Sequence, residues 1–208
     1  MQIIRLAALL LACAALGGCA LGEELDYSHG HIALLANRSD TPTAVAVLDQ
    51  RPYILSGDKR ENFVGLSRNG YGMPFDVKTR AGTPMAADMS AGITRALEEN
   101  GQPAKSVIVP PAEGVEGAKT RLRSSGAERQ LLFTLREWKT DTLEHTGLWF
   151  DVTLDVFDAT GEILASKHIS GKEISGGSFM SSEKDAQKWF SEKVGQLLDN
   201  RDVAAALR

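Results

Sequence analysis

The chain is poor in cysteine. It has only two, Cys13 and Cys19, both within the first 19 of its 208 residues. Everything after Cys19 therefore lacks a thiol, which excludes a disulfide framework or a cysteine-ligated zinc site in the body of the protein. A hydrophobic core must hold the fold together instead, and a hydrophobic content of 43% is normal for a globular domain.

The sequence also lacks an excess of basic charge and a long apolar run. It has 23 Lys and Arg against 27 Asp and Glu, so we expect neither nucleic-acid binding nor electrostatic docking to anionic lipid headgroups. The apolar stretch Leu6–Leu16 is about half the roughly 20 residues that a transmembrane helix needs. A membrane-spanning anchor is therefore not expected.

The first 18 residues are typical of a secretory signal peptide. Arg5 gives a positive n-region, Leu6–Leu16 an apolar h-region, and Gly17-Gly18 small residues before a cleavage site. The next residue is Cys19, so that Leu16-Gly17-Gly18-Cys19 resembles the bacterial lipobox. That resemblance implies cleavage before Cys19 and attachment of several acyl chains to it, which anchors a protein stably to a membrane. The alternative is an ordinary signal peptide with a chance cysteine.

These features predict a domain organisation and a location. We expect a cleaved signal peptide (1–18), a lipidated cysteine and tether (19–42), and a single domain (43–208). Ala20 stands where an aspartate usually retains enterobacterial lipoproteins in the inner membrane. By that resemblance the sequence predicts the outer membrane, with the domain facing the periplasm.

The remaining sequence predicts an α+β fold. The expected order is β-α-β-α-β-β-β-α, with helices packed on a mixed or antiparallel sheet. The expected strands are TAVAVLDQR from Thr43, KSVIVPPAE, RQLLFTLREWK, GLWFDVTLDVF and 162–174, and the helices lie at 83–101, 115–126, from Ser181 or Ser182, and at 203–207. The glycine-rich stretch Tyr53–Thr83 is too long for a routine loop, so it is either a functional loop or a short extra hairpin.

The two alternating segments around residue 144 predict an antiparallel hairpin with a defined register. One face pairs Leu131 with Val156, Phe133 with Leu154 and Leu135 with Val152, and the other pairs Thr134 with Thr153, Arg136 with Asp151 and Trp138 with Trp149. The third strand places His168 opposite Asp151 or Val152, depending on the loop. The sequence does not decide between them.

The same register makes Trp138 and Trp149 a candidate partner-binding face, together with Tyr71 of the glycine-rich stretch. The alternative is that this strand face lies under the C-terminal helix or the long loop.

The sequence offers little for catalysis. It has no GxSxG elbow, phosphate loop or HExxH motif. His29-Gly30-His31 lacks the third and fourth ligands that zinc requires, and Asp151 and Asp155 would lie about 13 Å apart on one strand, too far for a glycosidase pair. His145 is expected in a solvated loop. We expect no enzyme, no catalytic residue, no metal and no cofactor.

Several pieces resemble the YajG-type bacterial lipoproteins: the lipobox at Cys19, the strand end Asp49-Gln50-Arg51-Pro52, and Asn69-Gly70-Tyr71-Gly72. The helix from Met85 to Asn100, the three-stranded meander and the closing helix continue the resemblance. It implies a small periplasm-facing lipoprotein of α+β fold without enzymatic activity. It transfers no catalytic or ligand residues.

Three functional hypotheses follow. The first is a non-enzymatic outer-membrane lipoprotein whose domain binds another envelope component. The second is a small-ligand carrier that holds a lipid or glycan under the loop Tyr53–Thr83. The third is a periplasmic hydrolase, which would need His168, Asp151 and a serine in a tight cluster. The partner, the biological process and the oligomeric state are not encoded in any motif.

Overall fold

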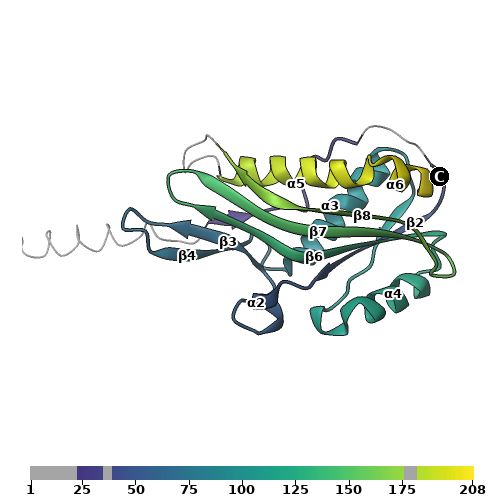
Figure 1. The fold of residues 1–208 in the computed structure, drawn as a ribbon, viewed down its shortest axis with the longest axis horizontal. Helices are drawn as coiled ribbons and strands as arrows, with labels where there is room; N and C mark the ends of the chain where they lie inside the picture. Colours follow the sequence, from purple (N-terminus) through teal and green to yellow (C-terminus); the bar gives the residue numbers. More distant parts are fainter. Residues whose placement is uncertain (1–22, 35–38, 176–181) are drawn as a thin grey trace, which may run out of the picture.

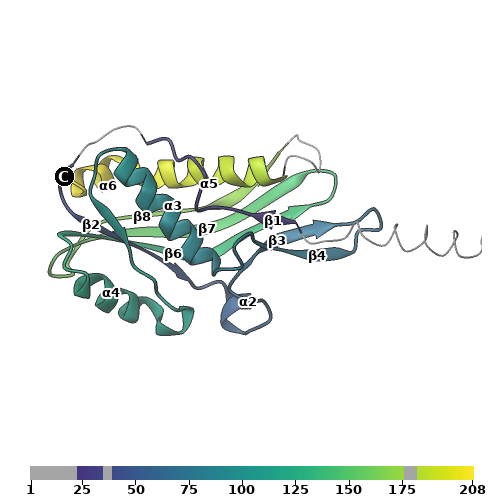
Figure 2. The ribbon, with the colours of Figure 1, turned by 180° about the vertical axis from the view of Figure 1, so that it is seen from behind.

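The computed structural model describes residues 23–34, 39–175 and 182–208. The predicted signal peptide (1–18), Cys19 and Ser181 lie outside the described residues. The described chain forms one mixed sheet of eight strands with helices packed on it (Figures 1 and 2). The predicted α+β class with helices on a mixed sheet is confirmed.

The elements follow the expected order, with additions at the N-terminus and in the glycine-rich stretch. The strands are β1 (Glu24–Leu25), β2 (Thr43–Asp49), β3 (Phe63–Arg68), β4 (Pro74–Thr79), β5 (Ala104–Ser106), β6 (Arg129–Thr142), β7 (Thr146–Asp158) and β8 (Ile163–Ile174). The helices are α2 (Pro52–Leu55), α3 (Met85–Glu99), the 3₁₀ turn η2 (Pro111–Glu113), α4 (Gly114–Ser124), α5 (Ser182–Leu198) and α6 (Arg201–Ala206).

Strand β6 is the spine of the sheet. Along one edge it pairs antiparallel with β7, which in turn pairs with β8. Along the other edge it pairs in parallel with two strands in succession: β2 lies beside Arg129–Leu135, and β3 lies beside Thr140–Thr142. The sheet therefore divides on that edge, with β5 beyond β2, and β4 and β1 beyond β3.

Helices cover both faces of the sheet near β2. All seven residues of β2 are buried, because Val45 and Val47 belong to the core under α3 and α5 whereas Ala44, Ala46 and Leu48 pack with α4. Small alanine side chains on the second face suit the close approach of α4. The predicted strand KSVIVPPAE is shorter than expected: β5 ends at Ser106, and Val107 donates one further backbone hydrogen bond to the Val45 carbonyl oxygen. The ladder could not extend past Val109, because Pro110 and Pro111 have no N–H.

The stretch Tyr53–Thr83 folds as a short helix, α2, and a hairpin of β3 and β4. Of the two alternatives, the extra hairpin is confirmed. Its turn depends on Gly72, whose φ of 79° lies in the left-handed region. Asn69 fixes the same turn, because its Oδ1 accepts hydrogen bonds from the backbone N–H groups of Tyr71 and Met73 at 3.0 and 3.1 Å.

The predicted β6–β7 register is confirmed from Leu131 to Leu135 and is wrong beyond it. A β-bulge between Leu135 and Glu137 shifts the pairing by one residue, so that Trp138 faces Phe150 rather than Trp149. A shift of one residue moves a side chain to the opposite face of a sheet. Trp138 therefore points into the core. In β8, His168 pairs with Thr153. Both expected partners, Asp151 and Val152, were therefore wrong.

The described part of the expected tether runs along the domain and contributes to its core. Strand β1 pairs in parallel with β4. Tyr27 is completely buried and its hydroxyl accepts a hydrogen bond of 3.0 Å from Trp138 Nε1. Its ring packs against Phe190 of α5 at a centroid distance of 5.1 Å. The folded domain therefore begins before the expected Thr43.

Gly92 of α3 makes this arrangement possible. A Cβ at this position would lie 2.4 Å from the carbonyl oxygen of Tyr27 and 3.3 Å from Phe190. The helix and the N-terminal segment can cross only because Gly92 has no side chain.

We predict that Gly92→Ala destabilises the protein by about 1–3 kcal/mol despite the higher helix propensity of alanine, because the clash is with backbone. Chemical denaturation followed by circular dichroism measures the change. Gly195→Ala in α5 is the control, since a Cβ there meets nothing closer than 3.4 Å, and we expect it to be neutral or stabilising. Equal stability of Gly92→Ala and the wild type would contradict the crossing described.

Candidate functional site

The division of the sheet leaves a gap along β6 that a buried ion pair fills. Between Leu135 and Thr140 neither β2 nor β3 pairs with β6. Arg51 occupies this place: its Nη1 donates to the carbonyl oxygens of Trp138 in β6 and Phe63 in β3, both at 2.9 Å. Its Nε and Nη2 donate to the two carboxylate oxygens of Asp49 at 2.8 and 2.7 Å. The guanidinium therefore links three strands.

This ion pair is fully enclosed. Arg51 is 0% exposed and Asp49 1%. Burial alone would lower the pKa of Arg51, but the hydrogen bonds and the charge of Asp49 hold this pKa above its ordinary value. Beside it, the Tyr53 hydroxyl donates to Glu137 Oε1 at 2.6 Å, and burial raises the pKa of Tyr53. Because every one of these groups has a partner, the cluster is suited to holding the strands together rather than to reacting with a substrate.

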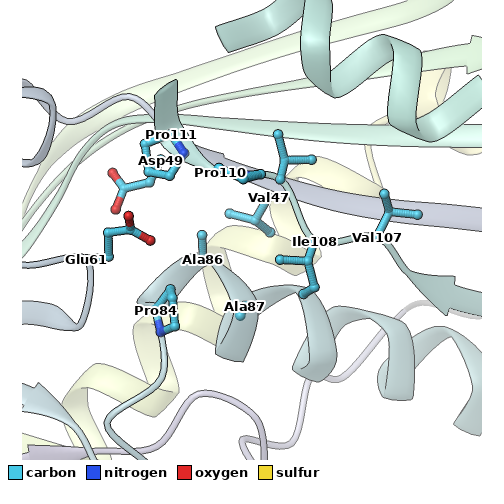
Figure 3. A pocket seen from close by; sticks show the side chains of 11 residues that line it. Val47, Asp49, Glu61, Pro84, Ala86, Ala87, Val107, Ile108, Pro110 and Pro111 are labelled. Atoms are coloured by element: carbon cyan, nitrogen blue, oxygen red, sulfur yellow. The ribbon is translucent and has the colours of Figure 1, made fainter. Parts of the chain in front are cut away.

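A cavity of about 240 Å³ opens next to Asp49 (Figure 3). Its walls are the end of β2, the first turn of α3 and the chain that follows β5. The lining residues are Val47, Asp49, Glu61, Pro84, Ala86, Ala87, Val107, Ile108, Val109, Pro110 and Pro111. Alanines occupy the first turn of α3, where larger side chains would fill this space, and Pro110 and Pro111 line the opposite wall.

The cavity is apolar except for two carboxylates on one side, those of Asp49 and Glu61 (Figure 3). Arg51 compensates the charge of Asp49. Glu61 is exposed and forms no ion pair with any described residue. The pocket therefore combines apolar walls with one open negative charge, which suits a small apolar group that carries a positive charge. No sequence motif marks this site, since its lining is mostly alanine, valine and proline.

The predicted partner-binding face is not formed by its three residues together. Trp138 is 1% exposed and packs against Tyr27 and Phe190, so including it was wrong; the bulge at Arg136 is the reason. Trp149 lies half-buried on the opposite face of the sheet, between Lys139 and Lys172. Tyr71 is 93% exposed at the tip of the β3–β4 hairpin.

The histidines do not come together. His29 Nδ1 lies 2.9 Å from Asp26, whereas His31 lies 4.0 Å from Glu99. Residues 23–34, 39–175 and 182–208 contain no group of three His, Cys, Asp or Glu that could hold a metal ion. His168 Nε2 lies 3.0 Å from Asp151 Oδ1 on an exposed face. Within the described chain no serine hydroxyl hydrogen-bonds to this ring.

Nor does the part of the chain described by the structure contain a helix that is both long and apolar enough to cross a membrane.

Comparisons with known proteins give similarities of fold only. The chain matches no family model and none of the curated proteins. Among solved structures, it is similar to the protein XCC0632 from Xanthomonas campestris, of family DUF330, with a TM-score of 0.45 and 13% identity over 84% of this chain and 98% of that one.

Two further structures are similar at comparably low identity. One is the PelC dodecamer from Paraburkholderia phytofirmans, with a TM-score of 0.45 and 16% identity over 81% of this chain and 91% of that chain. The other is the lipoprotein GNA1162 from Neisseria meningitidis, with a TM-score of 0.33 and 15% identity over 77% of this chain and 99% of that one. The resemblance to the YajG-type family stays a prediction.

We predict that Asp49→Asn lowers the free energy of unfolding by about 3–5 kcal/mol, because it leaves the charge of Arg51 buried without a counter-charge. Asp151→Asn is the matched control. Asp151 is partly exposed and pairs only at the surface with Arg136 and His168, so its loss changes stability by no more than about 0.5 kcal/mol. Urea denaturation measures both. A small effect at Asp49 would show that the pair does not hold the strands.

Proposed function

We propose that this protein is a lipid-anchored, non-enzymatic lipoprotein of the bacterial outer membrane, with its domain facing the periplasm and binding another envelope component. The observation that carries the proposal is the order of n-region, apolar run and Leu16-Gly17-Gly18-Cys19. Ala20 is the basis for proposing the outer membrane.

The folded domain begins close to the proposed anchor. Strand β1 begins at Glu24, only five residues after Cys19. A protein anchored at Cys19 would therefore hold its domain close to the membrane surface.

We predict that Cys19→Ser abolishes incorporation of radiolabelled palmitate and releases the protein from the membrane fraction. Cys13→Ser is the matched control: it removes the other cysteine, which lies in the predicted signal peptide, and is expected to change neither result. Palmitate labelling and sucrose-gradient fractionation of membranes are the measurements. Unlabelled wild-type protein, or a Cys19→Ser protein that still sediments with the outer membrane, would overturn the proposal.

The pocket supports a second function, binding of a small ligand. The sequence placed a ligand site under the stretch Tyr53–Thr83. The pocket lies elsewhere, because that stretch contributes only Glu61 to its lining. The pocket volume of about 240 Å³ is below the roughly 300–1,000 Å³ of drug-sized sites. It fits a single apolar group such as one side chain of a partner peptide, with the positive charge placed near Glu61.

We predict that benzylamine, used as a probe, binds saturably in this pocket and that uncharged benzyl alcohol binds more weakly, because only the amine can pair with Glu61. Amide chemical shifts of Ala86, Ala87, Val107 and Ile108 report binding in NMR titrations. Ala87→Phe fills the cavity and should abolish the shifts, whereas Ala91→Phe on the exposed side of α3 should preserve them. Equal binding of both probes would remove the role given to Glu61.

A further inference from the structure

The ends of several strands carry exposed apolar side chains on one side of the molecule. The β3–β4 hairpin presents Tyr71, Met73 and Phe75, which are 93%, 54% and 38% exposed. Leu143 in the β6–β7 turn and Ile174 at the end of β8 are also exposed. We call these five residues the apolar end.

Register shows that these residues share one end of the sheet. Because β3 and β6 are parallel, Ser67 lies beside Thr142, immediately before Leu143. Gly147, which follows the same turn, pairs with Ile174. The β3–β4 turn lies several residues beyond Ser67, so it projects furthest, as Figures 1 and 2 show for the hairpin. Half of the large hydrophobic residues that the structure exposes lie here.

The N-terminal end of β1 faces this same end of the sheet. Strand β1 is parallel to β4, with Glu24 beside Lys78. Toward its N-terminal end, β4 runs from Lys78 back to Pro74 at the hairpin turn. These four residues of strand span about 13 Å. Cys19 precedes Glu23 by four residues, which span at most about 14 Å. The predicted acylation site is therefore within reach of the hairpin turn.

The chemistry of the apolar end matches a lipid surface. Tyrosine is enriched at the headgroup level of membranes, where its ring lies in an apolar layer and its hydroxyl stays hydrated. The nearest charges behind the turn are already neutralised: Arg68 binds both carboxylate oxygens of Asp141 at 2.7 Å, and Lys59 pairs with Asp76. Glu144 and His145 lie in the β6–β7 turn beside Leu143, where headgroup depth keeps them hydrated.

Hydrogen bonds hold the β3–β4 turn in one conformation. Its apolar side chains are therefore presented by an ordered structure and not by a loose loop. Asn69 binds the backbone of Tyr71 and Met73, and the Gly72 N–H donates to the Asn69 carbonyl oxygen at 2.8 Å. The hairpin therefore holds Tyr71 in solvent at no gain to folding, since the ring has no buried contact.

We propose that the apolar end rests on the membrane, with Tyr71, Met73 and Phe75 at the level of the lipid headgroups. This proposal rests on the proposed anchor at Cys19 and adds an orientation to it. The acyl chains and the hairpin together fix the domain upright, and the β7–β8 turn and α6 point away from the membrane.

Tyr71→Cys in the lipidated protein, labelled with the fluorophore NBD, tests the orientation in vesicles of phosphatidylethanolamine and phosphatidylglycerol. We expect the emission to shift to shorter wavelength and to be quenched by brominated lipid. Ala159→Cys in the exposed β7–β8 turn at the far end is the matched control and should show neither change. Met73→Cys, which keeps Tyr71, should behave like Tyr71→Cys.

The outcomes separate the two proposals. If the protein floats with the vesicles but the label at position 71 stays as hydrated as that at position 159, the orientation is overturned and the anchor stands. If the label at position 71 is shielded equally in the unacylated domain (residues 20–208), in buffer without vesicles or detergent, the apolar end binds a second copy of the chain, and the proposal is also overturned. If the wild type neither incorporates palmitate nor floats, both proposals fail.

Discussion

The structure depends on one buried ion pair at the place where the sheet divides. Strand β6 is longer than either parallel neighbour, so β2 and β3 share its edge and leave backbone groups between them without a strand partner. Arg51 fills that gap by binding the carbonyl oxygens of Trp138 and Phe63 while Asp49 neutralises its charge. The motif Asp49-Gln50-Arg51-Pro52 therefore has a structural role in this fold. It ends β2, supplies the cross-link and starts α2 with a proline.

The sequence predicted the hairpin of β6 and β7 well because alternation of apolar residues carries that information over a continuous stretch. It failed at one residue. Arg136 and Glu137 are two consecutive polar residues between the inward-facing Leu135 and Trp138, and this spacing is the signal of a bulge. The pairs expected beyond Leu135, Arg136 with Asp151 and Trp138 with Trp149, assumed a continuous ladder. The error turned a core tryptophan into a candidate binding residue.

Two other features were outside the reach of sequence patterns for a different reason. Leu25, Tyr27 and Ile32 are buried although their segment has no regular period, because each contacts residues that are distant in the chain. The pocket beside Asp49 is formed by what is missing at Ala86 and Ala87, and small residues leave no distinctive pattern. Both depend on tertiary packing, whereas the α+β class, the meander and the closing helix depend on local periodicity.

The burial of Tyr27 determines when in synthesis the N-terminal part of the core can form. Its partners Trp138 and Phe190 lie more than 100 residues further along the chain. Under the proposed export, a chain that crosses from its N-terminus therefore cannot complete this part of the core until almost all of it has crossed. During that interval the segment next to Cys19 is not yet held against the domain. Under the proposed acylation of Cys19, the modifying enzymes would therefore act on a flanking segment that the domain does not yet hold.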